Sequence, residues 1–435
     1  MEQACAGCGY RSANRSFFRR EKIGLFGRRK IFCHGCAPYR PTRLENLSTH
    51  GVWLFMAGAL LAISGLEEPG RTIGYSLLLI GALNLSHVVT TIAHELGHAV
   101  AARLVGMKVV GVVVGSGPIL AARQWQGIRF EIRRYLLAGG RTAAYTQTES
   151  FAKWRHVVFM LGGAGANVLL LALAMGMLAL VATRLGFLNP LVFTAALCLV
   201  ALLAISQILA IIMALLPYKR RDGHAMRTSD GRHVVDLLFA KDFPQRLREG
   251  YLFWQGIALL QSGRNAEAQA HFERAHRLLP TSGAIFGLLV HSTSKTSGSE
   301  AAVRCYHEHG GALGRESEAA SAWARAEVAW HALLTRAPLL LPLADDLSER
   351  SMERLSTVPE IQATRGAILA ERGQLEPGLA LLTDGMRNSS RMADKARFAP
   401  FLARAERARG NSDLAAELEK LGQFLSAKSE PNALP

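Results

Sequence analysis

The first residues lack an apolar run and carry Cys, Arg and Gly instead, so we expect no signal peptide. It is also poor in acidic side chains, with 34 Asp and Glu against 50 Lys and Arg in 435 residues. The resulting net charge of +16 would suit nucleic-acid binding, but the basic residues gather beside apolar segments. We therefore expect membrane lipid, and not nucleic acid, as the anionic partner.

Cysteines are few: the chain has six, and four of them stand near its N-terminus. These four are Cys5, Cys8, Cys33 and Cys36. They form two Cys-x-x-Cys pairs with 24 residues between them, an arrangement that suits a tetrahedral zinc site, and His34 offers a spare ligand. Two disulfides or four unrelated thiols are the alternatives, but the ten Lys or Arg in residues 11–43 indicate the reducing cytosol. We predict a zinc ribbon with one structural zinc over residues 1–45.

Long apolar runs are confined to the first half of the chain. They cover residues 52–66, 73–105, 157–181 and 188–217. A helix needs about 20 apolar residues to cross a bilayer, so we expect four spans, the first extended by the few residues before it. Basic residues crowd alternate connections, while the other two carry only Arg71 and Arg184. This asymmetry predicts a transmembrane domain over residues 46–225 of an inner-membrane protein, with both termini cytosolic.

The segments outside the apolar runs carry two further patterns. Residues 108–120 and 127–137 read as strands, because apolar and charged side chains alternate in the second of them, and they predict a hairpin. Residues 245–426 read as helices that repeat. Small and aromatic residues occur there at tetratricopeptide spacing: Gly256, Ala268, Phe272, Ala275 and Pro280, with weaker copies near Gly366 and in residues 402–421.

We therefore predict an α-solenoid whose groove binds a cytosolic peptide or protein, with a plain helical array as the alternative. Residues 427–435 are predicted to be a disordered tail. The expected fold is mostly α: a polytopic membrane protein with a small zinc ribbon, a β-hairpin region and the α-solenoid.

The second apolar run contains the sequence HELGH at residues 94–98. His94 and His98 are four residues apart, so both lie on one helix face and can bind one zinc ion. Glu95 is placed to exchange protons with a zinc-bound water without ligating the metal. Asn84, His87 and Thr91 precede this motif on much the same face, which indicates a wet cavity, although His87 alone is more typical of packing than of ligation. The alternative for the motif is a polar cluster that holds helices together.

A catalytic zinc takes three protein ligands, so one more is needed. Asp222, beside Gly223 and just past the last apolar run, is the candidate, although Asp-Gly is also a common turn pair.

Four motifs occur in order within residues 92–224: HELGH, GMKVVGVVVGSGPIL, GGAGANVLL, and LLP followed by DG. In this they resemble the site-2 protease family of intramembrane zinc metalloproteases. The resemblance implies that His94, His98 and Asp222 bind the catalytic zinc, that Glu95 is the catalytic glutamate, and that Asn167 orients substrate or the oxyanion. The chain departs from the family at Ala164, at Ala214 and in the sequence YKRR before Asp222.

The expected function is zinc-dependent hydrolysis of peptide bonds in transmembrane or membrane-associated proteins. The substrate would be held extended against an edge strand near residues 108–120. An inactive membrane scaffold that gathers cytosolic partners is the alternative. A ribbon that recruits nucleic acid is a third interpretation, supported only by its basic residues and by Phe17, Phe18 and Phe32.

Overall fold

The computed structural model describes most of the chain. It covers residues 3–14, 17–22, 29–36, 54–58, 70–146, 153–184, 190–222, 225–239, 243–313, 318–389 and 391–429. The chain forms two compact units. One is Pro41–Tyr251, and the other combines Met1–Arg40 with Leu252–Pro435.

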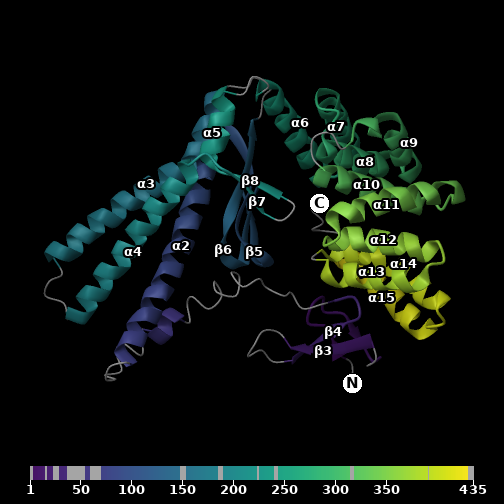
Figure 1. Ribbon diagram of the computed structural model, residues 1–435, viewed down its shortest axis with the longest axis horizontal. Helices are drawn as coiled ribbons and strands as arrows, with labels where there is room; N and C mark the ends of the chain where they lie inside the picture. Colours follow the sequence, from purple (N-terminus) through teal and green to yellow (C-terminus); the bar gives the residue numbers. More distant parts are fainter. Residues whose placement is uncertain are drawn as a thin grey trace. The chain divides into compact units, whose positions relative to one another are not determined.

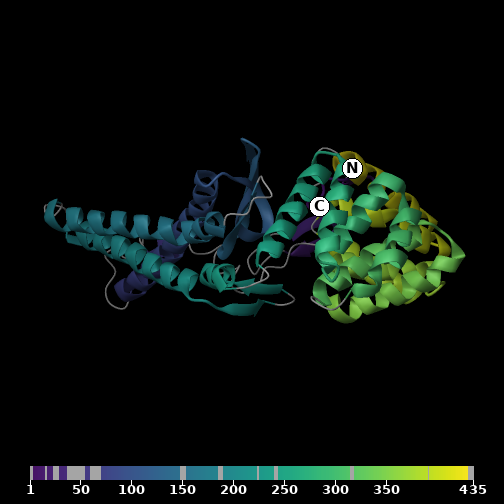
Figure 2. The same ribbon diagram turned by 90° about the horizontal axis from the view of Figure 1, so that it is seen from above.

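Three long helices dominate the unit Pro41–Tyr251: α2 (Gly70–Leu104), α3 (Lys153–Arg184) and α4 (Pro190–Leu215). They lie side by side (Figures 1 and 2). All three are long and apolar enough to cross a membrane, which agrees with the second, third and fourth predicted spans. The first predicted span falls outside the described residues, except for helical residues 54–58.

Two glycines let α2 and α3 approach closely. A Cβ at Gly97 would collide with the backbone of Gly162, and a Cβ at Gly162 would collide with Gly97 in turn. Away from this contact, Leu169 and Leu173 of α3 and Leu209 of α4 are exposed, as expected for faces that meet lipid. The glycine of HELGH is therefore a packing residue, and it brings the two motif-bearing helices together.

The predicted hairpin is present and longer than expected, with β5 (Met107–Trp125) paired antiparallel to β6 (Ile128–Thr146). The register folds back on itself, because Val112 pairs with both Thr142 and Phe130. Residues 111–114 therefore lie between two stretches of β6. A strand paired on both sides has no free edge, so the prediction that substrate binds an edge within residues 108–120 is wrong for residues 111–114. Residues 140–143 pair with β5 on one side and have no strand partner on the other among the described residues.

After α4 the chain leaves that helix in a short hairpin and then returns to its C-terminal end. A short hairpin of β7 (Lys219–Asp222) and β8 (Ala225–Thr228) leads into α5 (Asp230–Phe239). Helix α6 (Phe243–Gln261) then crosses the boundary between the two units. The β7–β8 hairpin was not predicted, and it decides which residues reach the site.

The second unit contains the predicted helical region. Its further helices are α7 (Asn265–Leu278), α8 (Gly283–Ser297), α9 (Ser299–His309), α10 (Glu318–Leu334), α11 (Leu341–Leu355), α12 (Pro359–Glu371), α13 (Leu375–Asn388), α14 (Met392–Ala408) and α15 (Ser412–Ser429). The three predicted copies fall on the helix hairpins α6–α7, α12–α13 and α14–α15. Their turns are alike: Gly263, Gly373 and Gly410 have positive φ, and the next N–H donates to a carbonyl five residues earlier. Tetratricopeptide ancestry stays a prediction.

The cysteine-rich segment consists of two small hairpins. Strand β1 (Gln3–Ala4) pairs with β2 (Arg11–Ser12), and β3 (Phe18–Lys22) pairs with β4 (Arg29–Cys33). This segment packs on the last helices of the chain. Tyr10 Oη donates to Glu417 at 3.0 Å, and Lys428 Nζ donates to the Cys8 carbonyl at 2.9 Å. Helix α15 ends at Ser429. Residues 427–429, which were predicted to be part of a disordered tail, therefore belong to this helix.

Candidate functional site

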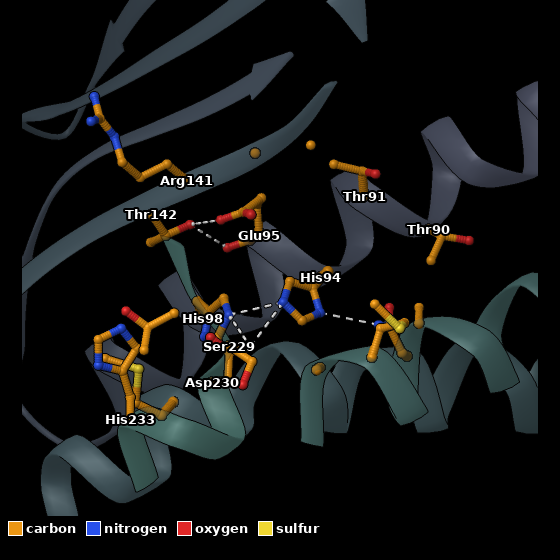
Figure 3. Close-up of a pocket in the computed structure, with 18 of the residues that line it drawn as sticks. Thr90, Thr91, His94, Glu95, His98, Arg141, Thr142, Ser229, Asp230 and His233 are labelled. Carbon is orange, nitrogen blue, oxygen red and sulfur yellow. Dashed lines mark hydrogen bonds and ion pairs between the residues drawn. The ribbon is translucent and has the colours of Figure 1, made fainter. Parts of the chain in front are cut away.

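A pocket of about 430 Å³ lies where α2, α3, α4, β6 and α5 meet (Figure 3). Its lining includes His87, Thr90, Thr91, His94, Glu95 and His98 from α2, Gly139, Gly140, Arg141 and Thr142 from β6, Asn167 from α3, and Ser229, Asp230 and His233 from the α5 region. His87 and Thr91 face the cavity as predicted. Asn84 instead donates to the Ile80 carbonyl of its own helix at 2.8 Å.

Two histidines and one aspartate converge at the pocket. The Nε2 atoms of His94 and His98 are 3.1 Å apart, and they lie 3.1 and 3.3 Å from Asp230 Oδ2. Ligands of a tetrahedral ion at about 2.0 Å are about 3.3 Å from one another. The three atoms thus have the spacing and chemistry of a zinc site that keeps one position open.

Ser229 explains why Asp230 reaches this point. Its hydroxyl donates to the Leu216 carbonyl at the end of α4, and it accepts the N–H of Arg232 at 3.2 Å. Ser229 is therefore the N-cap of α5 and also ties that helix to α4. Gly231 completes the contact, because a Cβ there would collide with the backbone of Leu215. The β7–β8 hairpin leaves α4 and returns to it, so Asp230 is presented beside α2.

The predicted third ligand, Asp222, is the last residue of β7, and its side chain lies outside the part that the structure describes. The described aspartate at the histidines is Asp230, eight residues further along the chain. Two Asp-Gly pairs lie between Pro217 and His233, and the prediction took the first. The second is preceded by a serine and followed by an amphipathic run, the pattern of a capped helix start, and its aspartate is the one that the structure describes beside the histidines.

Hydrogen bonds behind the histidines fix their orientation. His98 Nδ1–H donates to the Phe159 carbonyl at 2.7 Å, which leaves Nε2 free to bind a metal. The side-chain amide of Asn167 lies 3.1 Å from His94 Nδ1, and its Oδ1 atom is buried without a partner among the described residues. With the amide nitrogen and oxygen exchanged, Oδ1 accepts His94 Nδ1–H. That tautomer leaves Nε2 of His94 free as well, so the residues fit a bound zinc.

Glu95 is held apart from the ligands. Thr142 Oγ1 lies 2.7 Å from Glu95 Oε2 and 2.9 Å from the Glu95 carbonyl oxygen, so the one hydroxyl proton of this β6 residue is shared between the Glu95 carboxylate and its backbone. A Cβ at Gly140 would collide with the Glu95 side chain, and one at Gly163 would meet both imidazoles. The glycines of β6 and α3 therefore leave room for the reactive groups of α2.

The comparison with protein families agrees with this geometry. Residues 82–215 match the model of peptidase family M50. This matched stretch, the M50 region, contains the two histidines, Glu95 and Asn167. Peptidases of family M50 depend on zinc. A search of curated proteins found no match to the chain. Asp230, the cysteine-rich segment and the helices after α4 lie outside the M50 region.

The charge of Asp230 is stabilised by the site itself. Burial raises the pKa of this carboxyl, but the hydrogen bonds with His94 and His98 outweigh it and hold the pKa below its ordinary value. An ionised carboxylate is the form that ligates a metal.

A second metal-type cluster lies in the cysteine-rich segment. The Sγ atoms of Cys5, Cys8, Cys33 and Cys36 all lie within 4.8 Å of one another. All four cysteines are free, and Cys8 Sγ is 3.7 Å from Cys33 Sγ, which is too long for a disulfide and close to the roughly 3.8 Å edge of a zinc–thiolate tetrahedron. His34 stacks on Phe17 and is not part of the cluster. Burial lowers the pKa of His34 to about 4.

Proposed function

We propose that the protein is an intramembrane zinc metalloprotease of the site-2 protease type, which cleaves transmembrane or membrane-associated proteins. One observation carries this proposal: His94, His98 and Asp230 converge within 3.3 Å, while Glu95 is held separately beside them on apolar helix α2. Ionisable groups on a helix apolar enough to span a membrane are costly unless they serve a function.

His94, His98 and Asp230 would hold the catalytic zinc, with Asp230 in place of Asp222. When bound, zinc supplies a water of lowered pKa and a Lewis acid for the scissile carbonyl. Glu95 takes the proton of the attacking water and returns it to the leaving amine. Thr142 keeps the carboxylate at the cavity.

Asn167 acts on His94 in this proposal. The 3.1 Å contact with Nδ1 supports a positioning role for Asn167, in addition to the role toward substrate or oxyanion that the family resemblance implies.

The substrate must be unwound before cleavage, because the carbonyls of a helix are engaged in its own hydrogen bonds. We propose that it pairs with the outer side of residues 140–143 of β6. This stretch lines the pocket beside Glu95, so a paired strand would pass the reacting groups.

We also propose roles for the cysteine-rich segment and the helical unit, and an orientation in the membrane. The four cysteines would bind a structural zinc, the helical unit would bind a cytosolic peptide or protein, and both termini would face the cytosol at the inner membrane. An inactive scaffold is the weaker candidate, since the complete ligand set is accompanied by a glutamate that contributes nothing to ligation.

Chelation tests the proposal directly. The purified protein in liposomes should cleave a transmembrane substrate, lose that activity with 1,10-phenanthroline and regain it with added zinc. Mass spectrometry should place the new termini within the apolar segment of the substrate. Activity that survives complete removal of zinc would refute the metalloprotease.

A further inference from the structure

We propose a third metal site in the helical unit, formed by His291, Glu327 and His331 and selective for a divalent transition metal of the zinc class. His291 Nδ1 and His331 Nε2 lie 2.9 and 3.3 Å from the same atom, Glu327 Oε1. The donor atoms of the three residues all lie within 4.8 Å of one another. The site is separate from both the M50 region and the four cysteines.

The helix geometry builds this arrangement. Glu327 and His331 stand four residues apart on α10, so they share one face of that helix, and α8 packs against it with His291. Ligands of an ion at about 2.0 to 2.1 Å are separated by about 2.9 to 3.4 Å. The two observed distances lie within this interval.

Neighbouring groups leave the three donor atoms available to an ion. Ser299 Oγ lies 3.2 Å from His331 Nδ1, so the hydroxyl can accept that N–H and leave Nε2 as a ligand. Arg397 lies 3.6 Å from the other carboxylate oxygen, Glu327 Oε2, and its guanidinium stacks 4.0 Å from the Trp330 ring. Oε1 is thereby reserved for the histidine side.

The surrounding charge tolerates a cation. Arg397 interacts with Glu327, Asp394 and Glu360, and Asp394 also faces Arg391. These five groups sum to one negative charge, so a divalent ion is not placed in a positive field.

The donor set selects the class of ion. Two imidazoles and one carboxylate suit zinc and its neighbours, whereas magnesium and calcium prefer oxygen ligands alone. The side chain of His291 is 32% exposed and that of His331 is 9% exposed, so an ion can enter from one side and keep a water. The bound ion would link α8 to α10 and stabilise their packing.

Zinc stoichiometry tests the site in the full chain. The protein in detergent is stripped with a chelator, reloaded with zinc chloride, desalted and measured by inductively coupled plasma mass spectrometry. We expect three zinc ions per chain for the parent and two for His291→Gln or His331→Gln. His307→Gln changes an exposed histidine of neighbouring α9 and should keep the parent value.

Further variants separate this site from the others. His94→Ala and Cys33→Ala measure the zinc bound at the membrane site and at the four cysteines. If either of those sites binds no zinc, the parent holds fewer than three ions, but His291→Gln should still hold one ion fewer than the parent. His291→Cys retains a zinc ligand and should restore the third ion. Equal zinc in the parent, His291→Gln and His331→Gln would show that the cluster is only a hydrogen-bonded network.

Discussion

At the scale of single residues, the position of Asp230 depends on a serine and a glycine. Ser229 bonds to the end of α4 and caps α5, and Gly231 allows the backbones to touch. The sequence was sufficient to place His94 and His98 on one helix face with Glu95 beside them, because their spacing alone sets that geometry. It was insufficient for Asp230, since the β7–β8 hairpin separates this residue from α4 in sequence while α5 returns it to α4 in space.

The two aspartates give opposite predictions. Asp230→Ala should lose zinc from the membrane site together with activity, because it removes one of three ligands. Asp222→Ala is the matched control, and it should retain both. Zinc content measured beside cleavage distinguishes them. Loss of zinc from Asp222→Ala, with zinc retained in Asp230→Ala, would restore the original assignment.

Thr142 gives a prediction that concerns chemistry without ligation. Thr142→Val preserves shape and removes the hydrogen bond to Glu95, which is worth about 1.5 kcal/mol or more for a charged partner, or about tenfold in rate. We expect cleavage to fall by about that factor with zinc unchanged. Thr183→Val removes an exposed threonine hydroxyl that bonds only within its own helix, and it should cleave like the parent. A normal rate for Thr142→Val would remove this residue from the mechanism.

At the scale of elements, the cysteine-rich segment and the last helices form one packed structure. Lys395 is buried and donates to the carbonyls of Gly35 and Arg387 at 3.0 and 3.1 Å, and its Nζ lies 3.7 Å from Cys36 Sγ. A buried ammonium at this position would offset the charge of four zinc-bound thiolates. The cysteine spacing predicted the cluster, but nothing local in the sequence indicates a partner more than 350 residues away.

Lys395→Met should therefore weaken the cysteine site. Two carbonyls lose their donor, at a cost of about 1 to 3 kcal/mol each when buried. We expect zinc to pass to a colorimetric chelator at least tenfold faster than in the parent. Lys295→Met, on the exposed side of α8, should show the parent rate. Equal rates of zinc transfer in the parent, Lys395→Met and Lys295→Met would show that Lys395 of α14 does not stabilise the cysteine site.

At the scale of the whole molecule, the chain joins an apolar unit that holds the pocket to a second unit built from both ends of the sequence. Apolar periodicity predicted the three long apolar helices of the first unit and the helical character of the second, because burial patterns are local. The membership of the first 40 residues was not predictable, since it depends on tertiary packing alone.

This organisation dictates how the helical unit should be removed. Deleting Leu252–Pro435 alone would strip the cysteine-rich segment of its packing, so both parts must be deleted together. The remaining unit, Pro41–Tyr251, should keep its zinc and change which substrates are cleaved. Unchanged cleavage of the physiological substrate in cells would argue against a recruiting role for the second unit.

The central claim is that Glu95 moves protons beside a zinc ion held by other residues. Glu95→Gln should keep the zinc of the membrane site and the fold of the parent, and its cleavage of a transmembrane substrate in liposomes should fall by several orders of magnitude. A general base alone contributes roughly 100-fold to 10,000-fold, and the same carboxylate also acts as the acid. Zinc content and cleavage rate measured on the same preparation decide the matter: retained zinc with lost cleavage is the predicted result, and parental cleavage by Glu95→Gln would contradict the account.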